Sequence, residues 1–275
     1  MTVTIRRNSI QKVSTRLPRI FLLLFLLIFA FSPAFAQSTP KRTLTIAAAS
    51  DLQFALPQII SAYTRATANI VKVTYGSSGN LAAQIANGAP FDLLLSADAT
   101  YPRDLINKGQ AAPDSLTFYA RGALVVWFAS GSSDATVAAL DSASIRHIAI
   151  ANPKHAPYGR AAEAALRSAG IYEKVSSKLV LGENIAQTVQ FVDSGNADAG
   201  LVALSLLQGS RTEHRGVWKE VLLDSYPPLN QAGVVTVHGA QNPAAREFLA
   251  FLKSAESQAI LQRFGFKTPS TESKR

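Results

Sequence analysis

Residues 44–86 read LTIAAASDLQFALPQIISAYTRATANIVKVTYGSSGNLAAQIA, and the fold class follows from their pattern. A buried strand is predicted for residues 44–48, and apolar residues at helical spacing predict a helix over residues 52–67. Residues 70–75 alternate as a strand does, and residues 81–86 form a short predicted helix. This order of strand, helix, strand and helix indicates an α/β chain with a largely parallel sheet.

The same alternation continues along the rest of the chain. Strands are predicted at residues 92–95, 123–129, 148–150, 179–181, 199–202, 218–223 and 234–237. Helices are predicted at residues 101–107, 160–168, 185–192, 244–253 and 257–264. No internal repeat or low-complexity linker interrupts the pattern, so a mostly parallel sheet covered by helices on both faces is expected.

The first 36 residues have the features of a secretory signal peptide. Five basic residues and no acidic one precede an apolar run at residues 20–31, and Ala34-Phe35-Ala36 then supplies a small-x-small cleavage signal. A membrane anchor is the alternative, but this run is short and a spanning helix needs roughly 20 apolar residues. We therefore expect cleavage near Ala36 and export to the periplasm, with the general secretory and twin-arginine routes both open because of Arg6-Arg7.

Composition excludes several classes of protein. The whole chain carries 27 Lys and Arg against 18 Asp and Glu. Five of the bases lie in residues 1–36, which leaves 22 bases against 18 acids and a net charge of +4. So small an excess of positive charge is not typical of a nucleic-acid-binding protein. Because the chain contains no cysteine, disulfides, thiol catalysis, cysteine metal sites and a lipoprotein anchor are excluded as well.

Four segments share one design, in which a strand ends, a small or polar residue follows, and a helix begins. The first turn of a helix has unpaired N–H groups and a partial positive charge. Several helix starts at the carboxyl ends of parallel strands make an anion site in a crevice, and serine hydroxyls add donors without adding charge. The four segments are Ala49-Ser50-Asp51, Gly76-Ser77-Ser78-Gly79-Asn80, Ala156-Pro157-Tyr158-Gly159 and Gly182-Glu183-Asn184-Ile185.

Each of these segments taken alone has a structural alternative. Ser50 or Asp51 is a common N-cap, and Ser77-Ser78-Gly79 is a common turn. Tyr158 suits the rim of a cleft. Ile185 has the side chain of a core residue, so that only its backbone N–H would serve a ligand. Their joint occurrence in one α/β chain favours the anion site.

Other chemistry has little support in the sequence. Gly76-Ser77-Ser78-Gly79 is not the Gly-x-Ser-x-Gly elbow of hydrolases, and neither a Walker loop nor a dinucleotide-binding glycine motif occurs. The histidines at positions 147, 155, 214 and 238 lack the spacing of metal ligands. We therefore expect a binding protein that is not an enzyme, with no catalytic residue, no bare metal ion and no cofactor.

Five stretches of the chain resemble the periplasmic molybdate-binding proteins of ABC importers. The resemblance runs over nearly the whole mature chain, and the serine-rich loop followed by an Asp-x-x-x-Ser-Ala-Asp run is specific to that group. The stretches are residues 47–50 (AAAS), 75–85 (YGSSGNLAAQI), 88–98 (GAPFDLLLSAD), 152–159 (NPKHAPYG) and 261–266 (LQRFGF).

This resemblance implies a type II periplasmic binding protein, with two doubly wound α/β lobes and a ligand cleft between them. Lobe 1 is then expected to comprise residues 37–122 and 233–275, and lobe 2 residues 123–232. The predicted strands near residues 123–129 and 232–237 are candidates for the crossings. The implied ligand is molybdate or tungstate, in which molybdenum is held as an oxyanion. The implied partner is an ABC permease at the inner membrane, and the chain is expected to be a monomer.

The resemblance also implies ligand positions. Ser50 and Ser78 match the two serines that donate from the first lobe, Tyr158 matches the position at the helix start of the second, and Ile185 matches the residue that donates its backbone N–H. The family often has a tyrosine where this chain has Ala203, which cannot donate a hydroxyl. Tyr158 is a candidate to replace it, which leaves the donor set open.

Asp51 bears on the choice of ligand. A carboxylate pointing into the cleft would favour phosphate, which is partly protonated at neutral pH, over molybdate or sulfate. We expect instead that the Asp51 side chain caps the following helix, so that Asp51, like Ala203, is only a possible ligand residue. Asp92, Ser96 and Asp98 are part of the family signature, and we interpret them as structural residues at strand ends and helix starts.

Two other classes of function stay open at this point. One is a binding protein for sulfate, phosphate or another small anion, and a guanidinium of Arg121 or Arg160 aimed into the cleft would favour a carboxylate. The other is an exported serine hydrolase that uses Ser50 or Ser78, which would need a histidine within reach of one of them.

Overall fold

The computed structural model describes residues 41–130, 134–209 and 216–269, together with residues 1, 2 and 4. Apart from those three, the predicted signal peptide lies outside the described residues. Lys41–Arg275 form one compact unit. No helix within the described ranges has the length and apolarity that crossing a bilayer requires.

A first sheet has five strands in the order β2-β1-β3-β10-β4. Its strands are β1 (Thr43–Ala49), β2 (Ile70–Gly76), β3 (Leu93–Ser96), β4 (Thr117–Arg121) and β10 (Asn230–Val235). β1 is parallel to both β2 and β3, whereas β10 is antiparallel to β3 and to β4. Four strands therefore point the same way, as predicted, and β10 runs against them.

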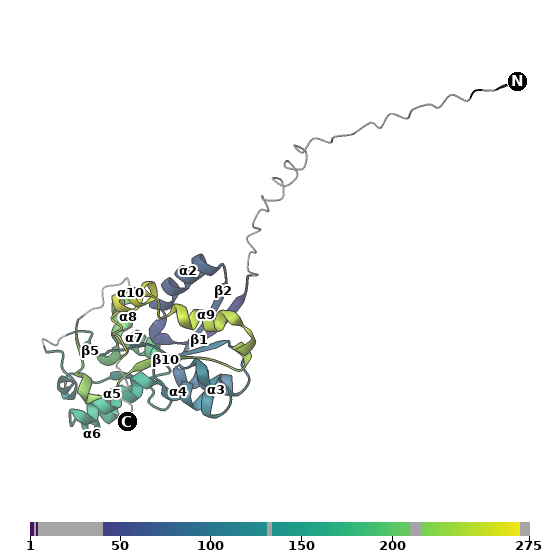
Figure 1. Cartoon of the computed structure of the whole chain (residues 1–275). Coiled ribbons are helices and arrows are strands. Elements are labelled where there is room, and N and C mark those ends of the chain that lie inside the picture. The colour runs from purple at the N-terminus through teal and green to yellow at the C-terminus, as the bar shows by residue number, and fades with distance from the viewer. Residues whose placement is uncertain (3, 5–40, 131–133, 210–215, 270–275) are drawn as a thin grey trace. The chain divides into compact units, whose positions relative to one another are not determined.

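Alternate side chains of this first sheet enter two different cores. Ile46 and Ala48 are buried together with side chains of α2, α9 and α10, whereas Ala47 between them is buried with side chains of α3 and α4. Figure 1 shows α2 and α9 on one face of β1 and α3 and α4 on the other. Burial on both faces explains why β1 is continuously apolar near its end. The helices are α2 (Ala55–Thr67), α3 (Ser78–Ala86), α4 (Thr100–Asn107), α9 (Pro243–Phe251) and α10 (Ala255–Arg263).

A second sheet has the order β7-β6-β8-β5-β9. Here β6 is parallel to β7 and β8, and β5 is antiparallel to β8 and β9. Its strands are β5 (Leu124–Phe128), β6 (Ile148–Ala151), β7 (Leu179–Gly182), β8 (Ala199–Ala203) and β9 (Val217–Glu220). The helices that follow in this region are α5 (Pro157–Ser168), α6 (Tyr172–Val175), α7 (Ile185–Asp193) and α8 (Leu204–Gly209).

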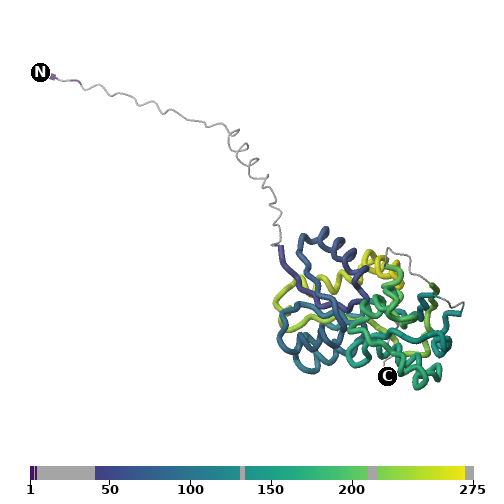
Figure 2. The backbone as a smooth tube through the Cα atoms, turned by 180° about the vertical axis from the view of Figure 1, so that it is seen from behind, coloured from purple at the N-terminus to yellow at the C-terminus, as the bar shows by residue number. Residues whose placement is uncertain are grey.

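The chain passes between the two sheets twice. It leaves the first sheet after Arg121, and it re-enters that sheet at Asn230. The Gly122 N–H donates a 2.9 Å hydrogen bond to the Leu229 carbonyl, so the two connections lie side by side. In Figure 2 the blue N-terminal and yellow C-terminal parts of the folded chain lie together, and the teal and green middle part forms the other half. The prediction of two α/β lobes is confirmed, and we call them the first and second lobe after their sheets.

The prediction of one helix over residues 52–67 is wrong at its start. A short 3-10 helix spans Ser50–Leu52, and the α-helix begins only at Ala55. The physical reason is Pro57, which has no N–H to donate and is tolerated only in the first turn of a helix. The strand β4 and the short helix α8 were not predicted, and β9 ends at Glu220, earlier than the predicted strand does.

Candidate functional site

Strand register brings the polar loops of the first lobe to one edge. Ala49 at the end of β1 pairs with Gly76 at the end of β2, and Ala48 pairs with Leu95 of β3. The residues that follow these strands therefore emerge together, at the carboxyl ends of parallel strands. Ser50 and Ser78 both lie here and are 3% and 1% exposed.

Ser78 ties two of these loops together while it begins α3. Its hydroxyl oxygen accepts a hydrogen bond of 3.0 Å from the Ala97 N–H, just after β3. The hydroxyl hydrogen of Ser78 is then free to be donated to another acceptor. Ser78 can therefore hold its own loop and donate to an anion at the same time.

The second lobe presents helix starts at the matching edge. Ala151 of β6 pairs with Gly182 of β7, so both strands end at one level. α5 begins after the first of them and α7 after the second. Asn184 caps α7, and its side-chain oxygen accepts the N–H groups of Ala186 and Gln187 at 3.0 and 3.1 Å. This cap engages those two groups and not the N–H of Ile185.

Ser50 of the first lobe lies against the start of α7 in the second. Its hydroxyl donates to Asn184 Oδ1 at 3.2 Å and accepts from the Ala186 N–H at 3.3 Å. The predicted positions Ser50 and Ile185 are therefore brought together across the lobes. The Ile185 side chain is buried in the second-lobe core, as expected for a residue that would offer a ligand only its backbone.

The serine-rich loop meets the loop before α5 in the same way. The Gly79 N–H donates to the His155 carbonyl at 2.9 Å, and the His155 Nδ1 lies 2.9 Å from the Ser77 hydroxyl oxygen. The first-lobe loops therefore face both helix starts of the second lobe. All four predicted segments meet at the junction of the lobes.

Ion pairs and hydrogen bonds also join the lobes around this junction. The Arg160 guanidinium of α5 pairs with the Asp98 carboxylate at 2.5 Å and donates to the Tyr101 hydroxyl at 2.9 Å. The Asn80 amide donates to the Glu183 carboxylate. Arg160 is therefore committed to this rim contact, which removes it as a guanidinium aimed at a bound carboxylate. Arg121 lies at the end of β4, where its backbone pairs with Lys267.

Asp51 does not cap a helix, and that prediction is wrong. Neither the 3-10 helix at Ser50–Leu52 nor α2 has a side-chain cap. The Asp51 carboxylate instead accepts a hydrogen bond from the Gln231 amide of β10, beneath the loops. Complete burial raises the pKa of Asp51 from its ordinary value of 3.8 to about 6, although Gln231 and Tyr158 act in the opposite direction. The cap fails because the side chain turns inward to the crossing strand.

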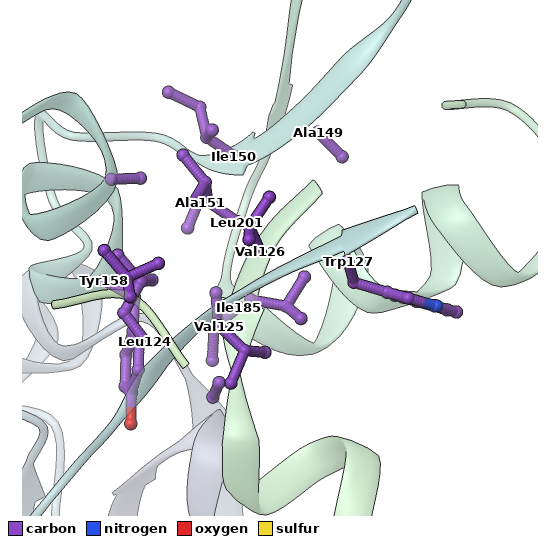
Figure 3. Close-up of a cluster of buried hydrophobic side chains, with 14 of the residues drawn as sticks. Leu124, Val125, Val126, Trp127, Ala149, Ile150, Ala151, Tyr158, Ile185 and Leu201 are labelled. Carbon is purple, nitrogen blue, oxygen red and sulfur yellow. The ribbon is translucent and has the colours of Figure 1, made fainter. Parts of the chain in front are cut away.

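Tyr158, in the first turn of α5, reaches the same buried place from the second lobe. Burial, and after it the charge of Asp51, raises the pKa of the Tyr158 hydroxyl well above 10. In Figure 3 this hydroxyl lies at the end of the ring remote from Ile150 and Ala151. The Tyr158 side chain therefore faces Asp51, while its backbone remains at the helix start.

Ala203 ends β8 and is completely buried. It pairs with Leu124 of β5, and its methyl group has no hydrogen to donate to an anion. The signature residues all have hydrogen-bond partners within the first lobe, as expected of structural residues. Asp92 accepts from the Thr45 N–H at 2.7 Å, Ser96 accepts from the Asp98 N–H at 3.3 Å, and Asp98 accepts from the Thr100 N–H at 3.1 Å.

The contact between Ser77 and His155 has the residue types of a hydrolase pair, and Glu183 lies 3.7 Å from the other ring nitrogen. Ser77 and His155 belong to opposite lobes, and Ser77 is 5% exposed, so little of its hydroxyl is open to a substrate in this arrangement. The predicted nucleophiles Ser50 and Ser78 have no hydrogen bond to a histidine among the described residues.

Sequence reasoning missed Gln231 as part of this region. Gln231 is a completely buried amide in β10, which begins with the polar pair Asn230-Gln231. In the parts of the chain that the structure describes, no group of three or more His, Cys, Asp or Glu residues could hold a metal ion. The junction thus offers hydroxyls and backbone N–H groups at helix starts, which suit a small anion.

Comparison with known proteins agrees with this geometry. The family described as bacterial extracellular solute-binding protein matches residues 44–267. The molybdate-binding protein ModA of Rhodobacter capsulatus is 38% identical over 211 residues, which are 77% of this chain and 82% of that protein. ModA of Azotobacter vinelandii is 37% identical over 222 residues, which are 80% of this chain and 88% of that protein.

A solved structure extends the likeness to three dimensions. The periplasmic molybdate-binding protein of Azotobacter vinelandii superposes with a TM-score of 0.77 at 33% identity, over 82% of this chain and 100% of that one. Its two-lobed α/β fold is the one described above. On the match of sequence and of structure, the chain belongs to the family of bacterial extracellular solute-binding proteins.

Proposed function

We propose that this protein captures molybdate, or the similar oxyanion tungstate, between its two lobes and delivers it to an ABC permease. The observation that carries the proposal is the contact of Ser50 with the start of α7, which places a first-lobe hydroxyl among second-lobe helix N–H groups. Molybdate-binding relatives at 37–38% identity favour molybdate among the small oxyanions.

The proposed donors are uncharged. They are the hydroxyls of Ser50 and Ser78 and the backbone N–H groups of Tyr158 and Ile185. The Ser50 hydroxyl, which donates to Asn184 Oδ1 in this structure, would turn its hydrogen to the anion. Each hydrogen bond to a charged acceptor contributes roughly 1.5–3 kcal/mol, so a few of them in a buried site hold a dianion tightly. The side chains of Asp51 and Ala203 are not donors, and these two residues could offer only their backbone.

The position of Asp51 also supports a fully ionised ligand. A carboxylate in the cleft would select a protonated phosphate by accepting its proton. Here the carboxylate is engaged by Gln231 and faces Tyr158. This engagement of Asp51 favours molybdate, tungstate or sulfate over a protonated phosphate, because the remaining donors are uncharged.

Calorimetric titration of the purified protein with molybdate, tungstate, sulfate, phosphate and succinate tests the ligand. We expect tight binding of molybdate and tungstate and much weaker binding of the other three. Submicromolar binding of sulfate, phosphate or succinate without binding of molybdate contradicts the proposal. Turnover of a generic ester substrate that is lost in Ser50→Ala or Ser78→Ala would favour the hydrolase instead.

The setting of this function is part of the same proposal. The predicted leader implies cleavage near Ala36 and release into the periplasm, and we propose that the exported chain acts as a monomer without a cofactor. Cell fractionation with and without residues 1–36 tests the location, and N-terminal sequencing of the exported form tests the cleavage site. Light scattering after size exclusion tests the oligomeric state, and a stable dimer would contradict the monomer.

A further inference from the structure

A buried group of four residues joins the lobes beneath the proposed anion site. We call it the anchor group, and it consists of Asp51, Gln231, Tyr158 and Gly122. Asp51 follows β1 of the first sheet, and Tyr158 comes from α5 of the second lobe. Gly122 and Gln231 lie in or beside the two connections between the sheets. The group therefore links the two lobes where the chain crosses between them.

Two oxygen atoms in the anchor group lack a hydrogen-bond partner. One oxygen of the Asp51 carboxylate accepts from Gln231, but the other, Oδ1, has no partner among the described residues, and neither has the Tyr158 hydroxyl. Both side chains are completely or almost completely buried, at 0% and 1% exposure. An unpaired buried polar atom is costly, so two such atoms on neighbouring side chains are suited to bond to each other.

Two observations indicate that these side chains lie close together. The Tyr158 hydroxyl and the Gln231 amide nitrogen, which donates to Asp51, both lie beside the position that a Gly122 Cβ would take, at 2.2 and 3.2 Å from it. The charge of Asp51 also raises the pKa of the Tyr158 hydroxyl, and Tyr158 lowers the pKa of Asp51. The two groups are thus within interaction range, although they do not have ordinary hydrogen-bond geometry in this structure. A small adjustment of the lobes would complete the bond.

We propose that Asp51 is a positioning residue whose carboxylate accepts a hydrogen bond from the Tyr158 hydroxyl across the lobes. This bond fixes the first turn of α5 over the bound anion. This inference rests on the proposed function. The Tyr158 hydroxyl serves as an anchor, while the backbone N–H of the same residue faces the ligand. Two contacts then stabilise the closed lobes, one at the anion and one at the Tyr158 hydroxyl beneath it.

Gln231 prepares the carboxylate for this contact. The Tyr119 hydroxyl donates to the Gln231 side-chain oxygen at 3.0 Å, which fixes the orientation of the amide. The amide nitrogen must then point the other way, toward Asp51. The Ser205 hydroxyl also holds the Asp51 carbonyl at 2.8 Å. These hydrogen bonds therefore fix the Asp51 carboxylate in an orientation that leaves Oδ1 free for the Tyr158 hydroxyl.

Gly122 supplies the space that the anchor needs. A Cβ atom on this residue would lie 2.2 Å from the Tyr158 hydroxyl and 3.2 Å from the Gln231 amide nitrogen. The hydroxyl occupies the volume that any other residue would fill with its side chain. A substitution here displaces the hydroxyl without altering either partner of the proposed bond.

A double-mutant cycle on Asp51 and Tyr158 tests the anchor. Tyr158→Phe removes only the hydroxyl, and we expect the molybdate Kd to rise about tenfold, mainly through faster dissociation. Asp51→Leu removes the acceptor and keeps the approximate volume. In that background Tyr158→Phe should change the Kd less than twofold, because its partner is already gone. Equal effects of Tyr158→Phe in both backgrounds would overturn the proposal.

A second cycle does not depend on the folding of the Asp51 variant. Gly122→Ala should weaken molybdate binding at least tenfold by displacing the hydroxyl. Adding Tyr158→Phe removes the 2.2 Å clash, so the double variant should bind more tightly than Gly122→Ala alone. If the second substitution weakens binding further, the Tyr158 hydroxyl does not occupy the space beside Gly122.

Tyr226→Phe is the matched control. The Tyr226 hydroxyl accepts from the Leu124 N–H at 3.2 Å, and both residues belong to the second-lobe core. Its removal should leave the Kd within twofold of the unaltered protein. A wild-type protein that binds neither molybdate nor tungstate contradicts the proposed function. A wild-type protein that binds molybdate but fails both cycles contradicts the anchor alone.

Discussion

The backbone N–H of Gly79, in the first turn of α3, donates a 2.9 Å hydrogen bond to the carbonyl oxygen of His155, in the loop before α5. Two loops from opposite lobes thus meet main chain to main chain. A Cβ atom on Gly79 would lie 2.7 Å from that carbonyl and 2.7 Å from the Tyr101 hydroxyl. The lobes can approach this closely because residue 79 has no side chain.

Gly79→Ala should therefore hinder closure. We expect the molybdate Kd to rise tenfold or more, because the new Cβ atom would clash with the His155 carbonyl of the other lobe. The clash with Tyr101 of the same lobe should also lower the free energy of unfolding. Calorimetry and urea unfolding measure the two quantities. Gly76→Ala is the control, since its Cβ would meet only the Leu81 side chain of the same lobe, at 3.3 Å. Equal affinities for the two variants would show that the Gly79 contact does not limit binding.

Ser78→Ala should reduce affinity and stability together. Loss of a hydroxyl donor to an anion should cost roughly 1.5–3 kcal/mol of binding free energy. The Ala97 N–H also loses its acceptor, which should lower the free energy of unfolding by about 1–3 kcal/mol. Ser61→Ala, at an exposed position of α2, is the control. An unchanged dissociation constant for Ser78→Ala would remove this residue from the site.

Arg160→Ala should shorten the lifetime of the closed state. The guanidinium joins the lobes through Asp98 and Tyr101, but it is 37% exposed, so screening limits its effect to about 1 kcal/mol, or roughly fivefold in the dissociation rate. Stopped-flow release of molybdate at low and high salt measures the dissociation rate. The difference in this rate between variant and wild type should shrink as the salt concentration increases. Arg65→Ala, which breaks the exposed pair with Glu256, should have no such effect.

Asp51 should make stability depend on pH. Its pKa is about 6 in the folded protein against 3.8 when unfolded, so the folded state binds the proton more tightly. The contribution of Asp51 to the free energy of unfolding is fully present below the unfolded-state pKa and is lost as the pH rises through the folded-state pKa. At neutral pH the loss is on the order of 3 kcal/mol.

Asp51→Asn removes this titration. The unfolding free energy of the variant minus that of the wild type should therefore be larger at about pH 7 than at about pH 4. Urea unfolding of both proteins at the two pH values measures this difference. A difference that is the same at both values would mean that Asp51 titrates in the folded protein as it does in water.

Much of the fold could be predicted because its signals are local. The strand β1 and the helices α3, α5 and α7 follow from apolar periodicity and from the residues at their ends, such as Asn184 before α7. The four loops were recognisable for the same reason, since a strand end and a helix start lie within a few residues of each other. Strand order then brought these loops to shared edges, as parallel strands do.

The hydrogen-bond partner of each polar side chain could not be predicted from the sequence. Ser50 was expected near Ile185, yet its bonds to Asn184 and Ala186 required the lobes to be placed. Asp51 has the local pattern of a helix cap, but its carboxylate meets Gln231, 180 positions along the chain. Composition, periodicity and loop motifs therefore predicted a leader for export and an α/β chain with helix starts suited to an anion. Which hydroxyls face the ligand and which hold the lobes depends on strand register and lobe contact, because hydrogen bonds form between neighbours in space and not between neighbours in sequence.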